Sequence, residues 1–161
     1  MVVFFRSVAV LAFALACSCP AWADFSGKVV AVADGDTLTV LTDRGPVEVQ
    51  LADIDAPELK QAFGPQSRQS LADLCLDKDA VVRETGNRYG RTVGRVACSG
   101  TDASSEQLRR GMAWVYKRRT ESTSPLYFLE DEAQRSREGL WSDKSQVAPW
   151  IWRRDHRRQL R

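Results

Sequence analysis

The stretch Val47-Glu-Val-Gln-Leu-Ala-Asp-Ile-Asp-Ala-Pro-Glu58 joins a strand to an acidic turn. Apolar and polar residues alternate strictly over its first five positions, which is the pattern of a β-strand with one face in a core. Gln50 is on the polar face of this strand, and Asp55 and Glu58 follow on either side of a proline. The stretch therefore predicts a strand that ends in a turn carrying carboxylates.

A second acidic turn, Asp34-Gly-Asp-Thr37, precedes this strand. Carboxylates gathered from two turns have three common uses. They bind a hard cation through oxygen ligands, one of them acts as a general base, or they form an ordinary solvated loop. Spacing alone favours the solvated loop, so residues farther along the chain must separate these alternatives.

Runs of β-branched and apolar residues, bounded by turn residues, predict five strands in the chain. They cover residues 27–32, 37–42, 47–51, 80–84 and 89–97, with a turn at Gly86-Asn87 before the last. Antiparallel closure is the natural way to hide the edges of so small a sheet. We therefore expect a mainly β (α+β) fold with a small closed barrel.

Three segments have the pattern of helices. The first runs from Gly64-Pro65 to residue 76. The second is a short helix over residues 106–110, capped by Ser104 and Ser105, and the third runs from Ser124-Pro125 to residue 139. We expect about three helices packed on the barrel.

The first 23 residues have the pattern of a secretory signal peptide. One basic residue precedes the apolar run 8–16, which is too short to span a bilayer as a helix, and Ala21-Trp-Ala23 is a cleavage pattern. We expect an exported monomer, periplasmic or secreted and free of the membrane. It would comprise a domain over residues 24–148 and a Trp- and Arg-rich tail over residues 149–161.

Charge does not by itself identify a partner, because the formal net charge of the full chain is only +2. Its distribution is more informative. Basic residues dominate segments 83–95, 109–119 and 153–161, whereas the carboxylates are crowded in the early turns. The tail could steer polyanions by its charge, although such tails are more often solvated, with Trp150 or Trp152 docked on the barrel.

Cys75 and Cys98 are the two cysteines that remain after signal cleavage. An even number of cysteines in an exported chain favours a disulfide over two buried free thiols. The bridge would stabilise the fold by roughly 3 kcal/mol on the chain-entropy estimate.

Several motifs, taken together, resemble the staphylococcal-nuclease-like (thermonuclease) family over nearly the whole mature chain. The most specific are Asp34-Gly-Asp-Thr37, Asp55-Ala-Pro-Glu58 and Tyr89-Gly-Arg91, in that order. They are accompanied by Phe63-Gly-Pro, Gly111-Met-Ala-Trp, Glu132-Ala-Gln and Gly139-Leu-Trp. The resemblance implies an OB-fold barrel of five strands with three helices.

The resemblance also implies a calcium site. Its ligands would be the carboxylates of Asp36 and Asp55 and the carbonyl of Ala56, with Asp34 just outside this shell. Calcium accepts such an irregular set of oxygens, completed by water and phosphate.

The same resemblance assigns roles around the substrate. Glu58 would be the general base on the attacking water, and Arg91 would bind and stabilise the phosphate, with Arg88 and Tyr89 beside it. These residue types suit the chemistry, because a phosphodiester gains negative charge on its oxygens as water attacks.

Gln50 departs from the family pattern, which has a second catalytic arginine at this position. Glutamine has no charge and cannot form a bidentate fork to phosphate. An arginine at a phosphoryl transition state is worth roughly 10³ to 10⁵ in rate, so we expect slowed catalysis unless another arginine compensates. Arg44, Arg83 and Arg95 are the candidates on neighbouring elements.

Two functions are therefore weighed. The leading one is an exported calcium-dependent nuclease that hydrolyses DNA or RNA phosphodiester bonds with little sequence preference. The alternative is a non-catalytic OB-fold binder of single-stranded nucleic acid or another anionic ligand, with bases stacked on Tyr89, Trp114 or Tyr116. Core packing would instead explain Trp114 and Trp141. Gln50 favours the binder, and the retained carboxylates favour the nuclease.

Overall fold

Five strands form a closed barrel in the computed structural model, which describes residues 24–88, 90–118 and 120–159. The strands are β1 (Phe25–Val32), β2 (Thr37–Thr42), β3 (Gly45–Leu51), β5 (Asp79–Arg88) and β6 (Arg91–Cys98). They pair antiparallel in the order β3-β2-β1-β5-β6, and a parallel pairing of β3 with β6 closes the ring. The predicted five-stranded OB-fold barrel is therefore confirmed.

Short strands extend the barrel at its ends. β7 (Thr101–Asp102) pairs with β6, and β4 (Ile54–Asp55) pairs with β8 (Trp114–Val115) in a separate two-stranded sheet. β4 contains the first carboxylate of the Asp55-Ala-Pro-Glu58 turn, so this pairing holds the acidic turn against the chain around Trp114.

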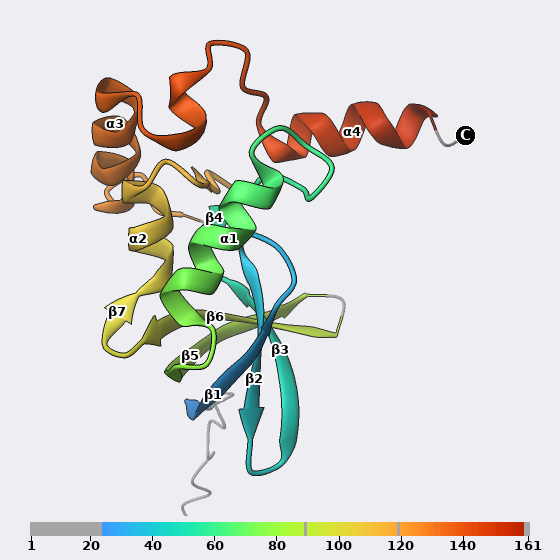
Figure 1. Ribbon diagram of the computed structural model, residues 1–161, viewed down its shortest axis with the longest axis vertical. Helices are drawn as coiled ribbons and strands as arrows, with labels where there is room; N and C mark the ends of the chain where they lie inside the picture. The colour runs from blue at the N-terminus through green and yellow to red at the C-terminus, as the bar shows by residue number, and fades with distance from the viewer. Residues whose placement is uncertain (1–23, 89, 119, 160–161) are drawn as a thin grey trace, which may run out of the picture.

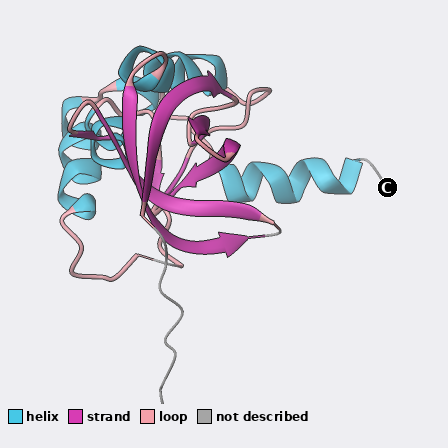
Figure 2. Ribbon diagram, turned by 90° about the horizontal axis from the view of Figure 1, so that it is seen from below, coloured by secondary structure: helices cyan, strands magenta, loops and turns pink. Residues whose placement is uncertain are grey.

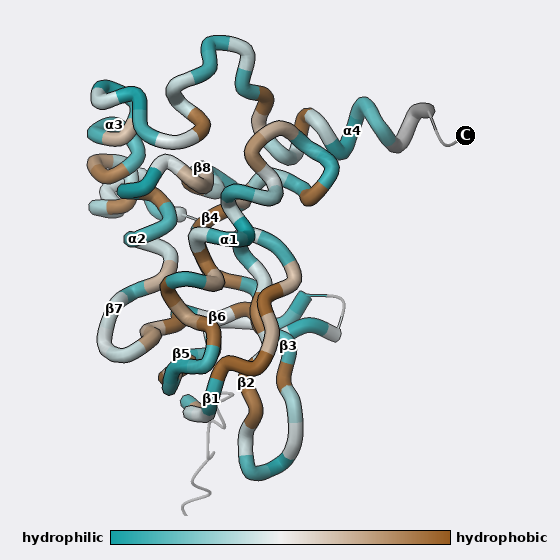
Figure 3. The backbone as a smooth tube through the Cα atoms, viewed as in Figure 1, coloured by the Kyte–Doolittle hydropathy of each residue, from teal (hydrophilic) through white to brown (hydrophobic). Residues whose placement is uncertain are grey.

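The interior of the barrel is aliphatic. Fully buried side chains come from all five strands and include Val29, Leu38, Val40, Val49, Val82 and Val96. Hydrophobic residues (brown in Figure 3) are concentrated along the strands, whereas the turn between β2 and β3 is hydrophilic. The strand periodicity seen in the sequence therefore becomes one continuous core.

Over the residues that the structure describes, four α-helices and one 3₁₀ turn accompany the barrel (Figure 2). They are α1 (Gly64–Cys75), α2 (Ala103–Arg109), α3 (Leu126–Ser136), the 3₁₀ turn η1 (Gly139–Ser142) and α4 (Pro149–Gln159). α1 and α2 place Leu71, Leu74 and Leu108 in the core, and α3 packs against α2 and β8. In the described part of the chain, no helix is both long and apolar enough to cross a membrane.

The last hairpin turn lies later than the sequence pattern predicted. β5 continues through Gly86 to Arg88, which pairs with Arg91, and the register shift near Gly86 is a bulge rather than a turn. Gly90 adopts a positive φ of 82°, and its N–H donates to the side chain of Asn87 at 3.0 Å. The turn therefore forms at Gly90, because glycine adopts the left-handed conformation without steric strain. The predicted turn at Gly86-Asn87 is wrong.

The second and third helices also differ from the prediction. α2 begins at Ala103 and is capped by Asp102, whose Oδ1 accepts from the N–H of Ser105 at 2.7 Å. Ser104 does not cap the helix, because its hydroxyl donates to the carbonyl of Ala52 at 3.0 Å. α3 ends at Ser136, three residues before the predicted end, because Arg137 adopts a left-handed conformation.

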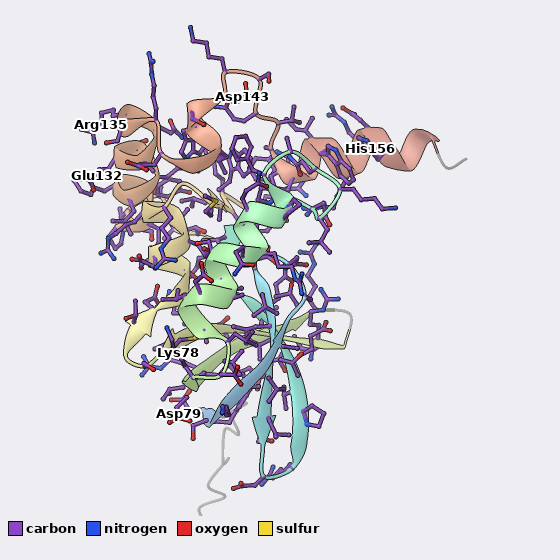
Figure 4. All side chains as sticks on the ribbon, viewed as in Figure 1. Lys78, Asp79, Glu132, Arg135, Asp143 and His156 are labelled. Atoms are coloured by element: carbon purple, nitrogen blue, oxygen red, sulfur yellow. A yellow bond between two sulfur atoms is a disulfide. The ribbon has the colours of Figure 1, made fainter. Side chains whose placement is uncertain are left out.

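The Trp- and Arg-rich C-terminal tail forms a helix, α4. α4 projects sideways from the body of the molecule in both ribbon views (Figures 1 and 2). Its first turn is held by the ring of Trp150, 6.4 Å from that of Tyr116, and the preceding Val147 carbonyl accepts from the side chain of Gln61. His156, labelled on α4 in Figure 4, stacks on Trp152.

Cys75 and Cys98 are joined by a disulfide, with their Cα atoms 5.2 Å apart. The bridge ties the end of α1 to the end of β6. The predicted signal peptide, residues 1–23, lies outside the described residues, as does Tyr89.

Candidate active site

Two helices, α1 and α2, hold the turn between β1 and β2 in place through contacts with Gly35. A Cβ atom added at Gly35 would lie 1.8 Å from the Ser67 hydroxyl on α1. The carbonyl of Gly35 accepts a 2.7 Å hydrogen bond from the buried side chain of Gln107 on α2. Glycine is therefore required here by close approach, and the neighbouring Asp36 is given a fixed position.

Asp36 links the two acidic turns. Its Oδ2 accepts from the backbone N–H of Ala56 and its Oδ1 accepts from the Thr37 hydroxyl, both at 3.0 Å. Burial raises the pKa of this carboxyl well above its usual value, and the charges of Asp34 and Asp55 raise it further. Negative charge is thus concentrated in a buried place, which a cation would relieve.

Asp55 and Glu58 share an arginine from α4. Arg153 donates from Nη1 and Nη2 to the two carboxylate oxygens of Asp55, at 2.9 and 2.6 Å. The Nη1 group also donates to Glu58 Oε1 at 2.9 Å. Burial raises the pKa of Asp55, although the bonds from Arg153 oppose this, and the bonds to Asp55 raise the pKa of Arg153.

The opposite wall is basic and belongs to the β5–β6 hairpin. Arg88 ends β5 and Arg91 begins β6, and the two residues pair across the turn. Arg91 forms an ion pair through Nε with Glu48 on β3. Gln50, also on β3, is opposite Thr37 on β2 and Val93 on β6, so it lies between the acidic and basic sides.

These walls enclose a cleft of about 390 Å³. Its lining residues are Asp34, Asp36, Thr37, Gln50, Ala56, Pro57, Glu58, Arg88, Arg91 and Arg153. Asp55 lines a smaller adjoining cavity, which shares Gln50 and Arg88 with the cleft. The structure therefore brings together every predicted site residue that it describes.

Comparison with known proteins identifies the family. Residues 48–143 match the model of the family described as staphylococcal nuclease homologue. The chain belongs to this family. A micrococcal nuclease of Shigella flexneri is 46% identical over 160 residues, 92% of this chain and 91% of that protein.

Further relatives carry related names. An uncharacterized endonuclease of Escherichia coli O157:H7 is 42% identical over 134 residues, 81% of this chain and 86% of that protein. The staphylococcal-like nuclease CAN1 of Arabidopsis thaliana is 34% identical over 113 residues, 68% of this chain and 34% of that protein. The likeness therefore extends from bacteria to plants.

The donor set of this staphylococcal nuclease homologue fits a hard cation. The described residues hold no group of three His, Cys, Asp or Glu side chains placed to bind a metal ion, but the predicted set needs only two carboxylates and a carbonyl. Asp36, Asp55 and Ala56 supply these oxygens from two turns joined by a hydrogen bond. Water and substrate oxygens would complete the coordination.

Arg153 is the residue of the cleft that sequence reasoning missed. It lies 98 residues after Asp55, on α4 and outside the matched region 48–143. The tail is rich in arginine, but no local sequence pattern distinguishes Arg153 from its neighbours.

The three arginines considered as replacements for the missing charge do not line the cleft. Arg83 pairs with Asp24 at 3.7 Å, and Arg95 pairs with Asp53 at 3.3 Å. Arg44 lies on the turn between β2 and β3. None of the three candidate arginines therefore reaches the cleft in this structure.

Proposed function

We propose that this staphylococcal nuclease homologue is an exported, calcium-dependent nuclease that hydrolyses DNA and RNA with little sequence preference. Its family and its relatives named as nucleases make it a phosphodiester hydrolase. The observation that carries the proposal is that Glu58 and Asp36 line the same cleft as Arg88 and Arg91.

The side chains of the cleft suit hydrolysis of a phosphodiester. Glu58 would take the proton of the attacking water, since a carboxylate within hydrogen-bond reach of an ordered water is a competent general base. Arg88 and Arg91 would hold the phosphate oxygens and stabilise the charge that develops on them. Arg91 has to exchange Glu48 for the phosphate, which is inexpensive because exposed ion pairs contribute little.

Nucleases of this family are generally metal-dependent. A calcium ion held by Asp36, Asp55 and the Ala56 carbonyl would supply Lewis-acid stabilisation of the phosphate. Calcium is proposed because all three ligands are oxygens, and calcium accepts an irregular set of oxygens more readily than magnesium, which demands near-ideal octahedral geometry.

Little sequence preference follows from the chemistry of the lining. Six of the ten lining residues are charged: three carboxylates, which suit a cation, and three arginines, which suit the phosphate oxygens. Contacts to the backbone position a nucleic acid but carry no sequence information directly.

Export is supported by the leader pattern of residues 1–23 and by the Cys75–Cys98 bridge. Disulfides persist in oxidising compartments and are rare in the cytosol.

The test is cleavage of denatured DNA and of RNA by the mature chain, with calcium and with chelator. Wild type should cut only with calcium, and Glu58→Gln should lower the rate by about 10² to 10⁴. Glu132→Gln removes one exposed carboxylate from α3 (labelled in Figure 4) and serves as the matched control. If the protein binds DNA in a salt-sensitive way but cleaves it under none of these conditions, the nuclease hypothesis is rejected in favour of the non-catalytic nucleic-acid binder.

A further inference from the structure

Arg153 has an unusual position for an arginine of a projecting helix. Among the described residues, its guanidinium donates three hydrogen bonds to the carboxylates of Asp55 and Glu58, and its side chain is 33% exposed. α4 is anchored at its first turn by Trp150 and by the contact between Val147 and Gln61. The position of Arg153 at the cleft is therefore fixed by the contacts that anchor α4.

Arg153 and a cation would compete for the same carboxylate. Each oxygen of Asp55 accepts one hydrogen bond from the guanidinium fork, so a cation at Asp55 would repel Arg153 and favour its release. A fork that fits a carboxylate also fits a phosphate. A phosphodiester entering the cleft would be the new anion within reach of the released guanidinium.

The positive charges around the cleft are unevenly distributed, so a bound phosphate would lack a cationic partner on the side of Gln50. Arg88 and Arg91 both come from the β5–β6 hairpin, while Gln50 on β3 contributes only a neutral amide. Among the described residues that line the cleft, Arg153 is the basic residue that belongs to an element other than this hairpin. It approaches from the wall of Asp55 and Glu58.

We propose that Arg153 is a further substrate-binding residue, which holds the phosphodiester in place of the charge that Gln50 lacks. The proposal rests on the proposed function, because it concerns the same cleft and substrate. It makes α4 part of the binding machinery and not only a support. A purely structural Arg153 would brace α4 and neutralise carboxylates, and the experiments below separate the two roles.

The first experiment measures cleavage of denatured DNA with calcium. Arg153→Gln should lower kcat/KM by about 10² to 10³, as loss of one preorganised donor does, and Arg153→Lys should fall between it and wild type. Arg154→Gln is the matched control, because Arg154 is the next residue of α4 and, among the described residues, pairs with its neighbour Asp155. The double variant Gln50→Arg, Arg153→Gln should recover most of the loss, which a brace would not allow.

The second experiment measures binding without turnover, in a Glu58→Gln background with calcium. The salt dependence of affinity for a short single-stranded oligonucleotide should lose about 0.7 in slope in Arg153→Gln, the value for one phosphate contact. The Arg154→Gln control should lose less. An unchanged slope would overturn the proposal, as would faster cleavage by Arg153→Gln, which would make Arg153 an inhibitory latch.

The two proposals fail separately. If wild type does not cut, the nuclease function is lost, but the salt slope still reports whether Arg153 contacts phosphate. If wild type cuts, and Arg153→Gln cuts equally well, only the role of Arg153 is lost.

Discussion

Gly35 shows how a residue without a side chain fixes the position of one with a charge. Its turn lies directly on Ser67, and the next residue, Asp36, is buried between the two acidic turns. Asp36 therefore depends on a close contact between backbone and helix that only glycine allows.

Gly35→Ala should destabilise the fold and displace Asp36. The new Cβ would lie 1.8 Å from Ser67 Oγ and 2.8 Å from the Cβ of Ala56, and overpacking of this kind costs about 1 to 3 kcal/mol. Chemical denaturation and DNA cleavage measure the two effects. Gly86→Ala is the control, since a Cβ there meets no atom within 4 Å; equal behaviour of the two variants would contradict the prediction.

The residues that the sequence predicted for the site share a local cause. Asp36, Asp55 and Glu58 lie in turns at strand ends, and a strand pattern places such turns at the same end of a small barrel. Arg88 and Arg91 flank a hairpin turn by the same logic. Arg153 has no such neighbour in sequence, because its helix reaches the cleft through tertiary contacts of Trp150 and Val147.

At the scale of elements, α3 is joined to β8 by a buried carboxyl. Glu130 Oε1 accepts from the backbone N–H of Val115 at 3.0 Å, and Val115 is opposite Ile54 of β4. Burial raises the pKa of Glu130. The junction behind the acidic turn thus contains a charge that the fold disfavours.

Glu130→Gln should increase stability relative to wild type as the pH rises. Because the pKa of Glu130 is raised in the folded state, its carboxyl loses the proton at a lower pH in the unfolded chain than in the folded protein. Its contribution to the free energy of unfolding is therefore retained below the unfolded value of about 4.5 and lost as the pH rises through the folded pKa. Gln keeps an acceptor for Val115 and does not ionise. Urea unfolding from pH 4 to 8 measures the difference.

Glu130→Ala and Glu132→Gln complete that series. Glu130→Ala leaves the buried N–H of Val115 without its acceptor, so it should be less stable than Glu130→Gln by about 1 to 3 kcal/mol at every pH. Glu132→Gln controls for the loss of one negative charge on the same helix. A pH-independent gain in Glu130→Gln would contradict the assignment.

Elements were predicted well where periodicity alone decides them and less well where a single contact does. The strands of the barrel follow the alternation of apolar residues, and α1 follows its Gly-Pro start. The start of α2 instead depends on Asp102, because Ser104 is bonded to Ala52. The last hairpin depends on the positive φ of Gly90, which the nearby Gly86 obscured.

At the scale of the whole molecule, α4 stands apart from the core. The described helix contributes no side chain to the hydrophobic core cluster, and its known ties are Trp150, Arg153 and the preceding Val147. A helix with so few contacts does not follow from its own sequence, because most helical stability comes from tertiary packing.

A chain ending at Ala148 should remain folded but bind and cut DNA poorly. Its unfolding midpoint in urea should stay close to that of the full chain, because the barrel keeps its core. The apparent dissociation constant for DNA should rise at low salt and converge with that of the full chain at high salt, as expected for lost phosphate contacts. Unchanged binding at low salt would show that α4 does not contribute.

The parallel seam between β3 and β6 joins Val49 to Thr92 and Leu51 to Gly94. The acidic turn follows one side of this seam, and the basic hairpin precedes the other. Catalytic activity therefore depends on closure of the barrel. A state in which the hairpins are formed but β3 and β6 are not paired would be inactive. Heat or denaturant should abolish cleavage no later than it opens the seam, and recovery of activity on refolding should mark the moment at which the ring closes.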